Sequence, residues 1–236
     1  MSQPALDPKI FDAYAAQYDA ALQQGLAVSG ETKDYFARGR ITWLMRTLRR
    51  LGEEPRAILD FGCGTGTSAR WFRETLPSAE VLGVDVSTGS LEVARRLHGE
   101  LGVKFSSLSD YPAERQFDLA FCNGVFHHIP PAERPQAVSF VVRALRPGGL
   151  FAFCENNPWN PGTRIVMSRI PFDRDAIPLS PPTALRLLRA AGLQTVRTDF
   201  LFVFPRPLKW LRGLEPLLCR LPLGAQYQIL CRKPAG

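Results

Sequence analysis

The sequence predicts an α/β protein with a Rossmann-like, doubly wound sheet of seven mostly parallel strands, an antiparallel final strand and helices on both faces. Three observations predict this fold. Short apolar runs alternate with helical segments between residues 57 and 154, these runs contain few charged residues, and the first run leads into a glycine-rich turn. Apolar strands separated by helices are typical of a parallel sheet that is covered on both faces. The length of 236 residues suits one domain with further elements attached.

The chain before the first strand is expected to be helical. Apolar residues recur at spacings of three and four between Phe11 and Leu22, which places them on one face of a helix. A second helix is expected over residues 33–51, and Gly52 ends it. Residues 1–52 are therefore predicted to form an N-terminal helical unit, followed by the main domain over residues 53–236.

The main domain is predicted to alternate strands and helices. We expect strands over residues 57–61, 80–84, 103–105, 117–122, 150–154, 195–203 and 226–232. We expect helices over residues 68–76, 89–97, 131–145, 182–191 and 207–221. Residues 156–180 are rich in Pro and Asn and show no period, and a loop of that length in a compact domain is usually functional or mobile. We predict that this segment is an insertion that determines specificity.

The composition is that of a soluble globular protein, and we expect a cytoplasmic location. Hydrophobic residues make up 45% and charged residues 22% of the chain. No stretch approaches the ~20 apolar residues of a membrane-spanning helix, and the first residues lack the pattern of a secretory signal. The five cysteines include no Cys-x-x-Cys pair, so reduced thiols are expected. With three histidines, two of them adjacent, no metal site is expected.

The formal charge of +7 is unevenly distributed along the chain. From Arg164 onward there are twelve basic and four acidic residues, so this stretch carries +8 and the remainder is nearly neutral. Such an asymmetry indicates either an anionic partner or a solvated basic surface.

The turn after the first strand, Asp60-Phe61-Gly62-Cys63-Gly64-Thr65-Gly66, has the features of a nucleotide site. Glycines allow the backbone to approach a ligand closely, and the helix that follows directs its first N–H groups toward that ligand. A dinucleotide fingerprint would require Gly or Ala where Thr67 stands, which disfavours a nicotinamide cofactor. The second strand ends in Asp85, whose carboxylate can accept hydrogen bonds from both ribose hydroxyls of an adenosine.

The spacing Asp-x-Gly-x-Gly-x-Gly resembles motif I of the class I S-adenosylmethionine (SAM)-dependent methyltransferases. The resemblance continues through residues 117–129 and 144–150 and covers about residues 14–154. The sequence is similar to the broad group that includes ubiquinone- and menaquinone-pathway methyltransferases and natural-product methyltransferases. The resemblance implies that SAM is the cofactor, that the chain is an enzyme, and that residues 1–52 cap the cofactor site.

The resemblance also implies which residues bind the cofactor. Asp85 matches the ribose-binding acid, Val86 lies beside the adenine, and Ser109 or Asp110 meets the adenine amino group. Tyr18 belongs to the closing helix, and Arg40 is either a partner for the methionine carboxylate or a surface charge. The complete expected set is Tyr18, Arg40, Asp60, Gly62, Gly64, Gly66, Asp85, Val86, Ser109, Asp110 and Asn123.

Three residues near the ends of the fourth and fifth strands are candidates for catalysis: His127, His128 and Glu155. An imidazole with a pKa near ~6.5 suits a general base, which an oxygen acceptor needs in order to lose its proton. The alternatives are that the histidines pack beneath the loop and that Glu155 belongs to a turn. Most of the acceleration is expected from alignment of the acceptor with the methyl donor.

The second half of the chain is expected to determine the acceptor. We predict a small molecule, apolar and anionic, lipid-like or a natural product, methylated on oxygen. Residues 207–214 combine Trp and Leu with basic residues, which suits a membrane surface as well as such a substrate. A nucleic-acid (RNA) methyltransferase, supported by the basic stretch alone, and a non-catalytic SAM-binding protein are the alternatives, and nucleic acid is not the expected partner. The oligomeric state stays open.

Overall fold

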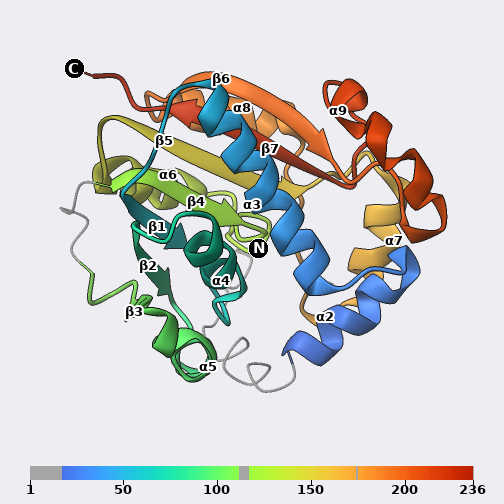
Figure 1. The fold of residues 1–236 in the computed structure, drawn as a ribbon, viewed down its shortest axis with the longest axis horizontal. Helices are drawn as coiled ribbons and strands as arrows, with labels where there is room; N and C mark the ends of the chain where they lie inside the picture. The colour runs from blue at the N-terminus through green and yellow to red at the C-terminus, as the bar shows by residue number, and fades with distance from the viewer. Residues whose placement is uncertain (1–17, 112–116, 174, 236) are drawn as a thin grey trace.

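The computed structural model describes residues 18–111, 117–173 and 175–235, with the side chains of residues 18–21 excluded (Figure 1). A seven-stranded sheet has the order β3-β2-β1-β4-β5-β7-β6. Its strands are β1 (Ala57–Phe61), β2 (Glu80–Asp85), β3 (Lys104–Ser107), β4 (Phe117–Asn123), β5 (Leu145–Asn156), β6 (Gln194–Leu201) and β7 (Gln226–Arg232). β1 to β5 pair in parallel, and β7 is antiparallel to both β5 and β6. This confirms the predicted sheet and its antiparallel final strand.

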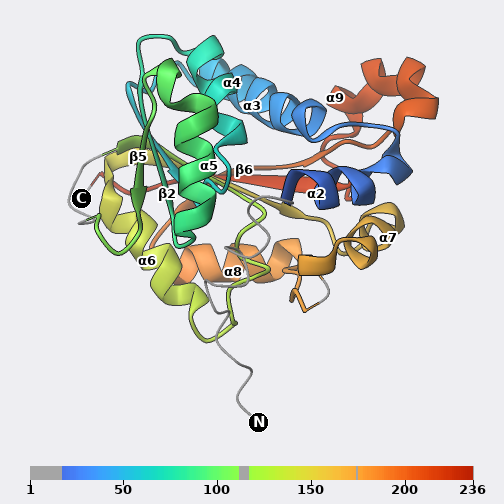
Figure 2. The ribbon, with the colours of Figure 1, turned by 90° about the horizontal axis from the view of Figure 1, so that it is seen from below.

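Helices cover both faces of the sheet, as the apolar strands predicted. Figure 2 shows α3 (Lys33–Arg50), α4 (Thr67–Thr75) and α5 (Thr88–His98) above the sheet, and α6 (Arg134–Ala144) and α8 (Pro181–Ala190) below it. One core layer joins α3 and α4 to the sheet and the other joins α6 and α8 to it. Each fully buried Leu, Ile or Phe in these layers contributes about 1.5–3 kcal/mol.

The N-terminal segment consists of α2 (Tyr18–Leu26), η1 (Ala27–Ser29) and α3. Thr32 caps α3, because its hydroxyl accepts a hydrogen bond from the N–H of Tyr35 at 3.2 Å. Ile41, Leu44 and Leu48 are buried against the sheet, so α3 is part of the core. The predicted helix face between Phe11 and Ala15 lies outside the described residues, and the cap role of residues 1–52 stays a prediction.

The segment predicted as an aperiodic insertion contains α7 (Pro161–Arg169) and η3 (Pro171–Asp173). Asn160 starts α7, because its side chain accepts from the N–H of Thr163 at 3.0 Å, and Pro161 occupies the first turn, where no N–H is needed. α7 lies beside α2 at the right of Figure 1, next to the carboxyl ends of the strands. The segment over residues 156–180 therefore contains a helix, α7, that the sequence did not predict. This helix lies next to the edge where ligands bind in such sheets.

The helix expected over residues 207–221 is instead η4 (Arg206–Leu214) followed by α9 (Glu215–Leu218). The backbone kinks at Leu208, and Pro207 and Pro216 lack the N–H groups that a continuous helix requires. β5 is also longer than the strand expected over residues 150–154. The N–H of Gly148 donates to the carbonyl of Lys233 at 3.0 Å, and the N–H of Lys233 donates to the carbonyl of Gly149 at 2.8 Å. The remaining short element is η2 (Gly99–Leu101).

All five cysteines are free thiols, and four of them are buried. No helix in the described ranges has the length and apolar character required to cross a membrane.

Candidate active site

The glycine-rich loop joins β1 to α4 at the carboxyl edge of the sheet. The N–H groups of Gly62 and Cys63 both donate to the carbonyl of Val84, at 2.8 and 3.1 Å. Gly62, Gly64 and Gly66 have φ angles of 69°, 52° and 75°, a region that other residues adopt only with strain. A Cβ atom on Gly62 would also lie 2.4 Å from Cγ2 of Val125, so this position requires glycine twice over.

Asp85 ends β2 and holds the loop in place. One oxygen of its carboxylate accepts from the N–H of Gly64 at 2.8 Å, and the other accepts from the N–H of Ser87 at 2.9 Å. A carboxylate has about four acceptor positions, so it retains capacity for the hydroxyls of a ligand.

A cavity of about 660 Å³ lies against this loop, within the range of small-molecule sites. The expected cofactor residues that line it are Arg40, Asp60, Gly62, Gly64, Asp85, Val86, Ser109 and Asn123. Asn123 Oδ1 is buried and has no hydrogen-bond partner among the described residues, so it is available to a ligand donor.

Two members of the expected set are placed elsewhere, and the side chain of a third is not described. Gly66 is the N-cap residue of α4 and does not itself border the cavity. Asp110 is exposed and accepts a hydrogen bond from the hydroxyl of Ser109 at 3.1 Å, while Ser109 faces the cavity. The side chain of Tyr18 lies outside the described part of the chain.

The floor of this cavity is acidic. Burial and the neighbouring carboxylate of Asp85 raise the pKa of Asp60 to about 7, although Arg40 acts in the opposite direction. Arg40 is buried at 7% exposure and donates to Oε1 of Gln226 at 2.9 Å, so it is not the surface charge that the sequence allowed. A ligand that brings positive charge would stabilise both carboxylates.

A second cavity of about 430 Å³ adjoins the first. The two share Leu22, Lys33, Arg40, Asn123, Gly124 and His128. Much of the second cavity is apolar, including Tyr35, Phe36, Met167, Ile170, Phe172 and Phe202. The cavities therefore meet where β4 ends, and two ligands bound in them would be adjacent.

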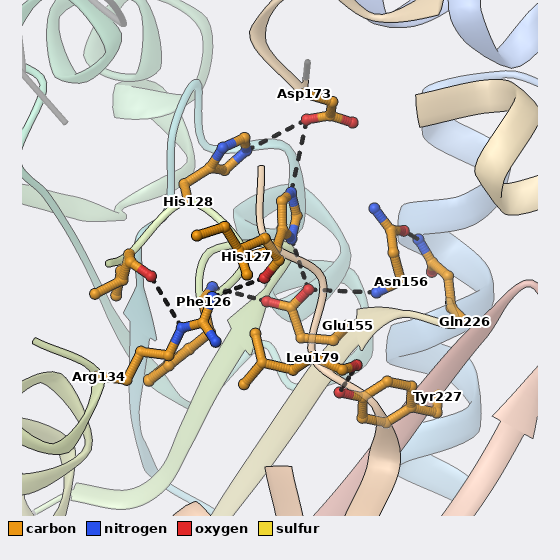
Figure 3. A network of polar contacts seen from close by, with 12 residues as sticks. Phe126, His127, His128, Arg134, Glu155, Asn156, Asp173, Leu179, Gln226 and Tyr227 are labelled. Carbon is orange, nitrogen blue, oxygen red and sulfur yellow. Dashed lines mark hydrogen bonds and ion pairs between the residues drawn. The ribbon is translucent and has the colours of Figure 1, made fainter. Parts of the chain in front are cut away.

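A buried array of polar side chains forms the wall next to this junction (Figure 3). Glu155 accepts from the N–H of Phe126 at 2.7 Å and contacts Nδ1 of His127 at 2.6 Å. Nε2 of His127 and Nε2 of His128 lie 3.6 and 3.4 Å from the same oxygen of Asp173. The structure thus brings together all three residues expected to act in catalysis.

The two histidines of the array have different protonation behaviour. Burial alone would lower the pKa of His127, but Glu155 and Asp173 outweigh it and raise that pKa to about 10. Burial, reinforced by the charge of His127, lowers the pKa of His128 well below its usual value. His127 therefore holds a proton between two carboxylates, and His128 stays neutral beside the cavities.

His127, His128 and Asp173 could in principle hold a metal ion, because their ligand atoms lie within 4.8 Å of one another. A protonated imidazole offers no lone pair to a metal. While His127 is protonated, it therefore cannot act as a metal ligand in this cluster.

Sequence reasoning missed two residues of the site. Lys33 lines both cavities, and its ammonium donates to the hydroxyl of Thr65 in the glycine loop at 2.8 Å. Asp173 belongs to η3, 45 residues after His128 in a segment without a period. The sequence around Lys33 and Asp173 contains no spacing that marks either residue as part of a site. The one available indication for Asp173 is that this acid ends an apolar stretch, Ile170-Pro171-Phe172-Asp173.

Comparisons with known proteins agree with this geometry. A family model described as a methyltransferase domain matches residues 58–149. A trans-aconitate 2-methyltransferase of Methylobacterium nodulans is 31% identical over 209 residues, covering 77% of each protein. A ubiquinone biosynthesis O-methyltransferase of Alkalilimnicola ehrlichii is 32% identical, covering 67% of each. For a trans-aconitate 2-methyltransferase of Rhodopseudomonas palustris, 30% identical, the chain spans 60% of that protein's length.

Solved structures share the fold at low identity. The plantazolicin methyltransferase BpumL, in complex with a substrate analogue and SAH, has a TM-score of 0.64 at 13% identity, covering 95% of this chain and 99% of that one. The [4+2]-cyclase SpnF has a TM-score of 0.60 at 20% identity, covering 83% of this chain and 81% of that one. A fold shared by a methyltransferase and a cyclase does not define the reaction, which must be argued from the site.

Proposed function

Because the chain belongs to the SAM-dependent methyltransferases, we propose that it transfers the methyl group of SAM to an oxygen of an apolar small molecule, lipid-like or a natural product. The observation that carries this proposal is the meeting of the two cavities at Asn123, Gly124 and His128. A methyl donor in the first cavity and an acceptor in the second would face each other there.

The first cavity suits SAM chemically. SAM supplies, when bound, a methyl group already activated by a positively charged sulfur. The carboxylates of Asp60 and Asp85 offer the negative charge that its cationic groups need. Asn123 Oδ1, buried and without a partner among the described residues, supplies a hydrogen-bond acceptor along the same wall.

The residues at the junction can take up the acceptor's proton. His128 is neutral near pH 7, because its pKa is lowered, and it borders both cavities. Asp173 contacts His128 through Nε2 at 3.4 Å, and the protonated His127 stacks beside it with ring centroids 4.1 Å apart. We assign His128 as the general base, and His127, Glu155 and Asp173 as positioning residues. A general base of this kind contributes about 10²–10⁴ in rate.

The second cavity supports an apolar acceptor. Its wall includes the six apolar and aromatic side chains named above, together with polar residues such as Asn156, Thr163 and Gln226. Among the relatives, two are named for trans-aconitate and one for ubiquinone biosynthesis O-methylation, which supports a small-molecule acceptor. The apolar character of the acceptor is argued from the cavity alone. An oxygen acceptor is consistent with a base at the junction.

RNA is a weaker candidate, because much of the basic C-terminal charge is engaged within the chain. Arg197 pairs with Asp199, and Arg212 pairs with Glu31. Arg232 pairs with Glu53, and Lys233 donates to two carbonyls. These contacts stabilise the fold and leave fewer cations for phosphate.

The experiment separates binding from transfer. SAM affinity is measured by calorimetry, and transfer is measured with methyl-labelled SAM and a cell extract. We expect His128→Ala and His128→Gln to lower transfer about 10²-fold or more with SAM affinity unchanged. Asp85→Ala should weaken SAM binding itself, since the carboxylate also fixes the loop.

Two outcomes would contradict the proposal. Undiminished transfer in both His128 variants would remove the assigned base. Undiminished SAM affinity in Asp85→Ala would place the cofactor outside the first cavity.

A further inference from the structure

The segment from η4 through α9 to Leu223 differs from the other elements of the fold. Neither η4 nor α9 contains a buried residue. Large apolar side chains on it are exposed, with Trp210 at 75% and Leu217 at 79%. Its other exposed apolar residues are Leu208, Leu214, Leu221 and Leu223. Helices such as η4 and α9, which contain no buried residue, lack the packing that normally stabilises a helix, and exposed apolar patches of this kind mark interaction sites.

The charges on this segment are mainly positive. Arg206, Lys209 and Arg220 are exposed. Arg220 also lies 3.7 Å from Oδ1 of Asp199 and donates to the carbonyl of Thr198, and Arg206 donates to the carbonyl of Gly30 at 3.4 Å. The one acid of the segment, Glu215, is partly buried and accepts from the N–H of Phe204 at 3.0 Å. Exposed Trp and Leu interleaved with Arg and Lys complement a surface that is apolar inside and anionic at its boundary.

The segment is anchored beside the second cavity. Arg212 pairs with Glu31 at 2.8 Å and lies over the ring of Tyr35, and both partners line that cavity. Asn160, which caps α7, donates to the carbonyl of Leu223 at 2.7 Å. Figures 1 and 2 show α9 at the same end of the sheet as α7 and α2. A membrane bound here would lie next to the cavity assigned to the acceptor.

We propose that residues 206–223, the docking surface, bind an anionic lipid bilayer and thereby give the second cavity access to an acceptor dissolved in the membrane. The assignment of the acceptor rests on the proposed function, whereas binding to the bilayer does not require methyl transfer. A second copy of the chain fits less well, because pairing two docking surfaces would bring like charges together.

The test is sedimentation of the full chain with vesicles, without SAM or acceptor. Vesicles of phosphatidylcholine are compared with vesicles that also contain phosphatidylserine. We expect binding to the anionic vesicles that weakens as salt is raised, because exposed charges are screened within about 10 Å at 0.1 M salt. Lys209→Gln and Arg220→Gln should each weaken partition about fivefold. Trp210→Ser combined with Leu217→Ser should weaken it about tenfold or more.

The matched control is Arg96→Gln combined with Leu97→Ser on α5, where an exposed base and an exposed leucine occur together. This variant should bind as the parent does. An equal loss of vesicle binding in the control variant would overturn the proposal. Equal binding to vesicles with and without phosphatidylserine would also overturn it. A different outcome would assign the docking surface to a second copy of the chain. In that case the chain does not bind vesicles, it sediments as a dimer, and the combined Trp210→Ser and Leu217→Ser variant sediments as a monomer. Because no methyl transfer is measured, these results are independent of the proposed reaction.

Discussion

Asp60 and His128 both line the first cavity, and burial shifts the pKa of each in the direction that favours the neutral form of the side chain. Burial raises the pKa of the Asp60 carboxyl to about 7 and lowers the pKa of the His128 imidazole. We therefore expect the Asp60 carboxyl to ionise when a cation binds beside it, and the neutral His128 imidazole to be able to accept a proton. The sequence predicted both residues, because Asp60 lies near the carboxyl end of β1 and His128 lies shortly after β4, at the ligand-binding edge. It could not predict Asp173 or Lys33, whose positions depend on how separate segments pack.

The pKa of Asp60 leads to a pH-dependent affinity for SAM. Below pH 7 the carboxyl is mostly neutral, and a bound cation favours its ionised form, so binding must release a proton. We expect affinity to rise with pH up to about 7, by at most tenfold for each pH unit. Calorimetry in buffers of different ionisation enthalpy measures the proton released.

Asp60→Asn is the control for this linkage. It should bind SAM more weakly and release no proton, because an amide does not titrate. Wild-type binding without proton release between pH 6 and 7 would show that Asp60 keeps its charge before the ligand arrives.

The glycine loop shows what can be predicted for an element from sequence and what cannot. Its spacing predicted a turn between β1 and α4, and all three glycines have positive φ angles. The segment containing α7 was missed, because Asn and Pro, which punctuate loops, here cap and begin a helix. The helix expected over residues 207–221 was wrong, because its two prolines interrupt the hydrogen bonding.

Gly62→Ala and Gly64→Ala form a matched pair within that loop. Both place alanine at a positive φ angle, which costs about 1–2 kcal/mol. Gly62→Ala also meets Val125, whereas a Cβ on Gly64 has no protein atom within 4 Å among the described residues. We expect Gly62→Ala to lower the free energy of unfolding by a further 1–3 kcal/mol or so. Urea denaturation without SAM measures both, and equal losses would show that Val125 moves aside freely.

The second cavity is a property of the tertiary arrangement. Its lining comes from α2 to α3, from the ends of β4, β5 and β7, from α7 and η3, and from the segment after β6. Several of these regions are far apart in the sequence. The periodic part of the chain, about residues 57–154, predicted the sheet and the cofactor side, because each strand and turn carries its own local signal. The acceptor side could not be predicted, since no local pattern records which distant segments share a wall.

The account as a whole predicts where a labelled methyl group goes. Purified protein is incubated with methyl-labelled SAM and an extract of its own cells, and products are partitioned into solvent-soluble, water-soluble, nucleic-acid and protein fractions. We expect the label in the solvent-soluble fraction, and we expect Asp85→Ala to abolish it. Label in nuclease-sensitive material would contradict the apolar acceptor and favour RNA. Absence of label in every fraction, despite calorimetric SAM binding, would contradict methyl transfer and favour a protein that only binds SAM.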